Sequence, residues 1–222
     1  ACVEVLEKNG IRVACPEQRC CGMPFLDGGD IEATKNSARA NVDSLHALVR
    51  EGYDVVVPGP TCSYMLKREY PMLLKGDAGQ GVAARTFDIC EYLMGLHSGG
   101  RLDTSFVRGM GRVAYQIPCH LRAQNIGYKS RDLMQLIPDT TVHLIEKCSA
   151  IDGTWGLKQQ YYDLSMKVAE PLLREIRESR PDWTASDCPL ARLQIKQGVG
   201  ERPLHPVQVL QMAYGLDRGT RG

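Results

Sequence analysis

Two adjacent cysteines, Cys20 and Cys21, are followed directly by Gly22 in the stretch QRCCGMPFLDGG. A disulfide between neighbours strains the peptide that joins them, because the usual Cα separation across a disulfide is longer than adjacent residues provide. Gly22 allows the backbone to bend so that both sulfurs turn the same way. We therefore expect this pair to act together with thiols from elsewhere in the chain.

The composition narrows the chemistry that these thiols can do. Nine cysteines in 222 residues are an odd number and too widely spaced for a disulfide scaffold. The sequence has no recognisable export signal, so we expect a reducing cytoplasmic compartment, where clustered cysteines more often serve metal or redox chemistry. A formal net charge of +1 gives no indication of a nucleic-acid partner. No stretch has the length and apolar character of a membrane span.

Helices and strands are predicted to alternate along the whole chain, which favours an α/β fold with parallel sheets. Asp30 is expected to cap one long helix, Gly52 to end it, and His205 to begin the last helix. Pro171 is expected to interrupt the second long helix. The predicted strands are 11–16, 53–62, 111–121, 141–148 and 182–189. The predicted helices are 1–10, 30–52, 63–71, 82–100, 130–139, 157–179, 190–198 and 205–216, with a loop at 75–81.

The chain repeats one unit. A short predicted strand precedes Cys20 and another precedes Cys148, and each cysteine is followed by a glycine-containing loop, a long helix and a further strand. Cys62 ends that strand 42 positions after Cys20, and Cys188 does so 40 positions after Cys148. The fold is therefore predicted to be two pseudo-symmetric copies of a parallel-sheet α/β unit, with cysteines at the carboxyl ends of the strands.

The second copy has an earlier strand-end cysteine, Cys119, which lies 29 positions before Cys148. The same offset from Cys20 falls before the first residue, so we expect the first copy to lack its opening strand and cysteine, and the sequence to be a fragment. The two cysteine-rich repeats are predicted to span 1–105 and 106–222.

Six cysteines are predicted to converge at two sites, because the carboxyl ends of parallel strands meet at one edge of a sheet. Thiolates that meet at one point repel each other unless a cation neutralises them. Soft thiolate ligands favour iron–sulfur clusters, zinc or Cu(I). The predicted ligands are Cys20, Cys21 and Cys62 at one site, and Cys119, Cys148 and Cys188 at the other.

The remaining cysteines are predicted to be structural. Cys2 and Cys90 fall on apolar helix faces and Cys15 falls within a predicted strand, where a cysteine acts as a small hydrophobic side chain. His120 follows Cys119 directly. Its imidazole either contacts a cluster at the second site or caps the local backbone.

Five motifs together resemble a known family: RCCGMPFLDGGD, PGPTCSYML, AYQIPCHLRAQNIG, GTWGLKQQYYDLSMKVAEP and SDCPLARLQI. They resemble the paired cysteine-rich (CCG) domains found in the B subunit of heterodisulfide reductase, the C subunit of anaerobic glycerol-3-phosphate dehydrogenase and the iron–sulfur subunit of glycolate oxidase. The resemblance spans nearly the whole chain and is strongest to the glycerol-3-phosphate dehydrogenase protein. It implies one or two 4Fe–4S clusters, cubane or non-cubane, held by the six cysteines.

The sequence departs from the family pattern of one cysteine, a Cys-Cys pair and a Cys-x-x-Cys, repeated twice. The second pair is Cys148-Ser149, followed by Ala150 in place of glycine. Met65 and Ala191 occupy the last positions of the two Cys-x-x-Cys motifs. Each site keeps three cysteines, which leaves open a cubane with a non-cysteine fourth ligand, a zinc site or an empty site.

By resemblance, the chain is an iron–sulfur electron-transfer subunit of an oxidoreductase complex, passing electrons between a flavin dehydrogenase partner and quinone or another carrier. Other redox subunits are implied as partners, and contact with the inner face of the membrane would be indirect, through them. Two alternatives stay open: a thiol/disulfide reductase acting at a cluster, and a degenerate zinc-binding or metal-free scaffold.

Overall fold

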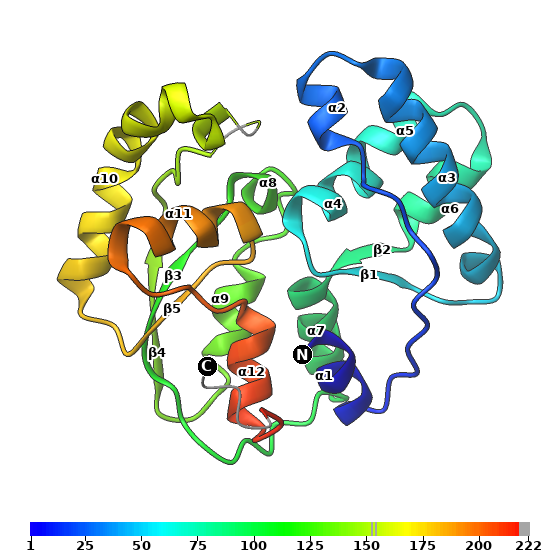
Figure 1. The fold of residues 1–222 in the computed structure, drawn as a ribbon. Coiled ribbons are helices and arrows are strands. Elements are labelled where there is room, and N and C mark those ends of the chain that lie inside the picture. The colour runs from blue at the N-terminus through cyan, green and yellow to red at the C-terminus, as the bar shows by residue number, and fades with distance from the viewer. Residues whose placement is uncertain (152, 154, 218–222) are drawn as a thin grey trace. The chain divides into compact units, whose positions relative to one another are not determined.

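The computed structural model describes residues 1–151, 153 and 155–217. It contains two small parallel sheets flanked by helices (Figure 1), which confirms the predicted α/β class. The chain forms two compact units, a smaller one at Ala14–Ile89 and a larger one that joins Ala1–Val13 to Cys90–Gly222. The predicted repeat boundary at residue 105 stays a prediction, since these compact units are divided elsewhere.

In the smaller unit, β1 (Val55–Val57) pairs in parallel with β2 (Thr86–Asp88). The long helix α3 (Ile31–Arg50) begins where Asp30 accepts a hydrogen bond from the Ala33 amide at 2.9 Å, as predicted. Its buried residues pack with Met65 and Tyr70 in one apolar core. The other helices are α2 (Met23–Asp27), α4 (Pro60–Tyr64), the π-helix η1 (Met65–Glu69), α5 (Tyr70–Leu73) and α6 (Asp77–Ala84).

In the larger unit, β3 (Gly111–Gln116) is the central strand, with β4 (Thr140–Ile145) on one side and β5 (Trp183–Ala185) on the other, all parallel. Helices α10 (Tyr162–Ser179) and α11 (Pro189–Val199) pack against each other (Figure 1). Its other helices are α1 (Cys2–Lys8), α7 (Ile89–Ser98), α8 (Cys119–Arg122), α9 (Lys129–Met134), α12 (Pro206–Ala213) and the 3₁₀ turns η2 (Trp155–Leu157) and η3 (Gln159–Tyr161).

Three expectations about local structure are wrong. Residues 11–16 form no strand. The helix expected at 82–100 is divided into the end of α6, strand β2 and helix α7, because Thr86–Asp88 pair with β1. Residues 77–81, expected in a loop, belong to α6.

Pro171 lies inside α10 and does not end it, which also differs from the expectation. The helix keeps a continuous buried face at Ala169, Leu172, Leu173 and Ile176 on both sides of the proline. The packing of that face outweighs the one backbone hydrogen bond that a proline removes. No helix of the described residues is both long and apolar enough to cross a membrane.

Two leucines of α10 provide a matched test of this packing. Leu172 is fully buried, whereas the Leu164 side chain is 54% exposed. Leu172→Ala should lower the free energy of unfolding by about 2–5 kcal/mol, because it leaves a cavity in the core. Leu164→Ala should change it by less than about 0.5 kcal/mol. Urea unfolding followed by circular dichroism measures both values, and equal losses in the two variants would contradict the packing described here.

Candidate metal-binding sites

Three of the predicted ligands follow the three strands of the larger sheet. Cys119 begins α8 just after β3, Cys148 follows β4, and Cys188 is the N-cap residue of α11 after β5. Since the three strands are parallel neighbours, the three cysteines lie at the same edge of the sheet. Cys119 and Cys148 are exposed and Cys188 is half-buried, so this edge is open to solvent or a partner.

The other three predicted ligands lie together in the smaller unit. Cys62 is in the first turn of α4, after β1, and Cys20 and Cys21 come from the loop that precedes α2. Hydrogen bonding to the Cys62 thiol, burial, and the Cys62 charge raise the pKa of Cys21, and Cys20 also interacts with its side chain. The neighbouring Cys62 thiol therefore opposes ionisation of Cys21.

Two buried side chains hold the Cys20–Cys21 loop in place. Asn41 of α3 donates to the Cys20 carbonyl at 3.3 Å and to the Tyr70 hydroxyl at 2.9 Å. Tyr70 in turn donates to the Cys21 carbonyl at 3.0 Å. Burial is the main cause that raises the pKa of Tyr70 to about 12, and the charges of Cys21, Cys62 and Cys20 add to it. The phenol therefore stays protonated and keeps its hydrogen bond to the loop at physiological pH.

The cysteine loop of each repeat contains a residue with left-handed backbone, which the sequence of the second repeat does not indicate. Gly22 has φ +92°, and Ala150, which replaces glycine in the second repeat, has φ +60°. Left-handed backbone is costly for a residue with a Cβ. The turn in the second repeat is held by Ser165, which donates to the Ala150 carbonyl at 2.8 Å and accepts from Gln194 at 2.7 Å. The CCG turn thus persists where its glycine has been replaced.

Both residues that replace the last motif cysteines lie in apolar cores. Met65 is fully buried and Ala191 is 2% exposed. The Met65 side chain belongs to the core of the smaller unit. Both side chains therefore contribute to apolar packing. Cys15, expected in a buried strand, is instead exposed in an irregular segment, which corrects its assignment as a core residue.

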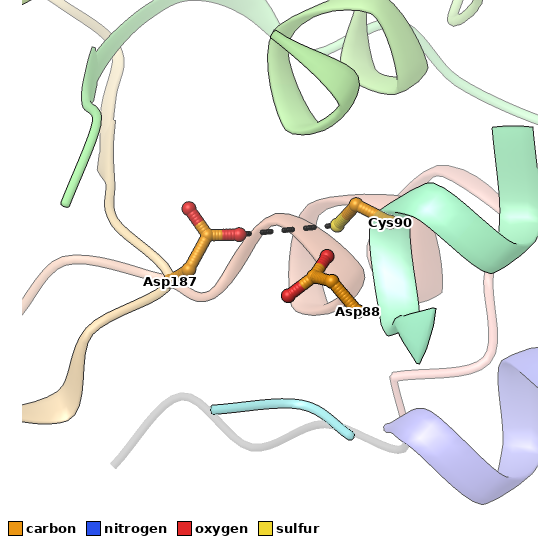
Figure 2. Close-up of side chains that lie close together, drawn as sticks. All are labelled: Asp88, Cys90 and Asp187. Atoms are coloured by element: carbon orange, nitrogen blue, oxygen red, sulfur yellow. Dashed lines mark hydrogen bonds between the residues drawn. The ribbon is translucent and has the colours of Figure 1, made fainter. Parts of the chain in front are cut away.

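Cys90 is buried as expected, but its thiol has a polar partner. It donates to the Asp187 carboxylate at 3.9 Å (Figure 2), and Asp187 also accepts from the Tyr115 and Ser130 hydroxyls at 2.6 and 2.7 Å. Asp187 is only 1% exposed and directly precedes Cys188. The three donors therefore fix the backbone next to a predicted ligand. Asp88, also drawn in Figure 2, ends β2 of the smaller unit.

Among the described residues, neither triad has its three sulfurs all within 4.8 Å of one another. In a tetrahedral zinc site, with Zn–S bonds of about 2.3 Å, the sulfurs lie roughly 3.8 Å apart. The Cys148 sulfur also accepts a hydrogen bond from the Ala150 amide at 3.3 Å.

An apolar cavity adjoins the first triad. Its volume is about 360 Å³, and it lies within the smaller unit between segment 14–19, α3 and β1. Leucines of α3 and the valines of β1 contribute to its wall, and Cys15, Cys21 and Cys62 also line it. No sequence pattern indicates this cavity, because its wall combines segments that are distant along the chain.

The raised pKa of Cys21 makes a prediction for the metal-free protein. At pH 8, Cys21 should react with iodoacetamide more slowly than Cys20, because a raised pKa leaves less of the reactive thiolate. Cys62→Ala removes the main cause of the shift and should speed the reaction of Cys21, with Cys119 of the other unit as the unchanged reference. Mass spectrometry of timed samples gives each rate. A Cys21 rate that Cys62→Ala leaves unchanged would show that Cys62 does not govern its ionisation.

The chain is similar to known proteins over most of its length. The chain is 28% identical to the C subunit of anaerobic glycerol-3-phosphate dehydrogenase from Escherichia coli K12, over 95% of this chain and 54% of that protein. It therefore spans about half the length of that relative. It is also 28% identical to lactate utilization protein A of Geobacillus kaustophilus (85% of this chain, 79% of the relative) and of Bacillus pumilus (98% and 91%). The profile of the cysteine-rich domain family, CCG, matches residues 1–67 and again 113–196. The chain belongs to the CCG cysteine-rich domain family and contains two matches to that domain.

Proposed function

We propose that the chain is an iron–sulfur electron-transfer subunit of an oxidoreductase. The observation that carries this proposal is the placement of Cys119, Cys148 and Cys188 at the ends of three neighbouring parallel strands. Membership of the cysteine-rich domain family supports it, as does similarity to a relative named as a dehydrogenase subunit. The ligands would be these three cysteines at one site and Cys20, Cys21 and Cys62 at the other.

The residues present fit an iron–sulfur cluster. Iron–sulfur clusters bind thiolate ligands, and the Cys21 side chain interacts with those of both Cys62 and Cys20. A bound cluster would supply one-electron transfer.

The chain's own residues would hold and tune such a cluster. The Ala150 amide donates to the Cys148 sulfur, and hydrogen bonds to ligand sulfurs are one of the means by which proteins set cluster potential. Asn41 and Tyr70 fix the Cys20–Cys21 loop, so that its thiols need little rearrangement when they bind iron. Met65 and Ala191 leave each triad one cysteine short, so the fourth ligand would be an oxygen or nitrogen donor or a group from elsewhere.

A partner subunit would cover exposed apolar side chains of α10 and the turns that precede it. Leu164 and Val168 lie one turn apart on α10 and are 54% and 46% exposed, and Leu157 and Tyr161 in the preceding turns are 50% and 40% exposed. The same helix contacts the Cys148 loop through Ser165. Exposed apolar surface of this kind suits a protein partner. In this proposal the partner is a flavin dehydrogenase subunit that donates electrons, which pass on to quinone or another carrier.

The apolar cavity favours a second candidate function, thiol/disulfide reduction at the first site. A cavity of about 360 Å³ is within the range of small-molecule sites, and two predicted ligands open into it. Reducing an organic disulfide to two thiols takes two electrons and two protons, which a cluster would deliver in two one-electron steps from the dehydrogenase partner. Turnover of a disulfide by the reduced, cluster-loaded chain would distinguish this candidate from electron transfer alone.

Metal analysis tests both candidates. The chain purified without oxygen should contain iron and acid-labile sulfide in equal amounts, about four of each per occupied site. Cys62→Ala should empty the first site and Cys148→Ala the second, because each removes one of three thiols. Cys2→Ala, on α1, is the matched control and should keep the wild-type content. Iron and sulfide assays, with the EPR spectrum of the reduced protein, measure the outcome.

Zinc without sulfide, or no metal, would contradict both redox functions and leave the scaffold interpretation. Equal losses of iron and sulfide in Cys2→Ala and Cys148→Ala would show that the metal content depends on general stability and not on which cysteine is a ligand.

A further inference from the structure

One buried side chain touches the loops of two cysteines of the second triad while its own strand leads to the third. Gln116 is the last residue of the central strand β3, three positions before Cys119, and it is 3% exposed. Its amide nitrogen donates to the Lys147 carbonyl at 3.2 Å, next to Cys148. Its amide oxygen accepts from the Ser186 hydroxyl at 2.8 Å, two positions before Cys188.

Ser186 extends this contact to the backbone of Cys188. Its hydroxyl oxygen accepts a hydrogen bond from the Cys188 amide at 3.4 Å while its hydrogen is donated to Gln116. Ser186 is fully buried. The path from Gln116 to the Cys188 backbone therefore lies in a region without competing water, where hydrogen bonds are stronger and an unpaired group is costly.

The chemistry of the site requires an amide at position 116. The Lys147 carbonyl needs a donor, and the Ser186 hydroxyl, which already accepts from Cys188, needs an acceptor. An amide side chain offers both in one plane. Leucine has a similar size and offers neither. The three cysteines at the sheet edge thus share one side chain that fixes the separation of their loops.

We propose that Gln116 is the positioning residue of the second thiol triad, acting on Cys148 through the Lys147 carbonyl and on Cys188 through Ser186. The positioning itself does not depend on which metal binds. Its use in holding a cluster rests on the proposed function, and the two are tested separately below.

The first test uses metal-free protein and measures alkylation of each thiol by iodoacetamide with mass spectrometry. Gln116→Leu should raise the rates at both Cys148 and Cys188, by roughly fivefold for one typical hydrogen bond lost. Ser186→Ala should raise the rate at Cys188 and leave Cys148 unchanged. Adding Ser186→Ala to Gln116→Leu should raise the Cys188 rate by less than the product of the two single effects, because both changes act on the same path.

Cys20, in the other unit, is the internal reference for both variants, and circular dichroism verifies that each variant folds. Parallel changes at Cys148 and Cys188 in Ser186→Ala, or changes of the same size at Cys20, would overturn the proposal, because general loosening and not positioning would then explain them. Unchanged rates in Gln116→Leu would overturn it as well.

The second test uses the chain purified without oxygen. Gln116→Leu should lower the iron bound at the second site and alter its EPR spectrum, with the first site unchanged. If the alkylation pattern appears as expected and the wild-type chain contains no iron, the positioning role stands and the proposed electron transfer fails. If iron is present and the alkylation pattern does not appear, the positioning role fails alone.

Discussion

Parallel pairing of β3 with both of its neighbours determines where the chemically important side chains of the larger unit lie. Parallel strands end at the same edge of a sheet, so three cysteines that are widely separated in the chain come to one edge. The pairing also places the end of β3 between the other two loops. A side chain at that position, Gln116, can therefore reach both of them.

The two units secure their cysteines by different means. In the larger unit, hydrogen bonds come from the sheet itself through Gln116, and from Tyr115 and Ser130 to the buried Asp187. In the smaller unit, β1 is paired with β2, and the helices supply the contacts through Asn41 and Tyr70. Burial increases the cost of a lost contact in both units, because polar groups removed from water are stabilising only while every partner is present.

Residue patterns along the chain predict much of this fold. Apolar runs that end in cysteine locate β3, β4 and β5, and the Asp30 and His205 helix starts are confirmed. The failures have a physical cause. β2 is three residues long and lies within an apolar stretch that also suits a helix, so only its pairing with β1 defines it. Residues 11–16 have a strand-like composition, but composition does not supply a neighbouring strand with which to pair.

The side chains that hold the sites are harder to predict than the cysteines. Cysteines stand out by type and spacing. Tyr70 and Gln116 do not, because each contacts a loop 31 or more positions away and resembles an ordinary core or surface residue until the partners are known. The left-handed Ala150 is hidden for the same reason, since only the fold shows that its position requires the backbone of a glycine.

The division of the chain into units has a consequence for the order of assembly. The smaller unit is continuous, from Ala14 to Ile89, so all of its segments leave the ribosome in one block. The larger unit joins α1 to α12, and Gln211 of α12 donates to Glu4 of α1 at 2.6 Å across nearly the whole described chain. Contacts so distant in sequence close slowly, because the intervening chain must first be brought together. During synthesis the thiols of the smaller unit are therefore assembled first, and the larger unit is completed only after α12 has been made.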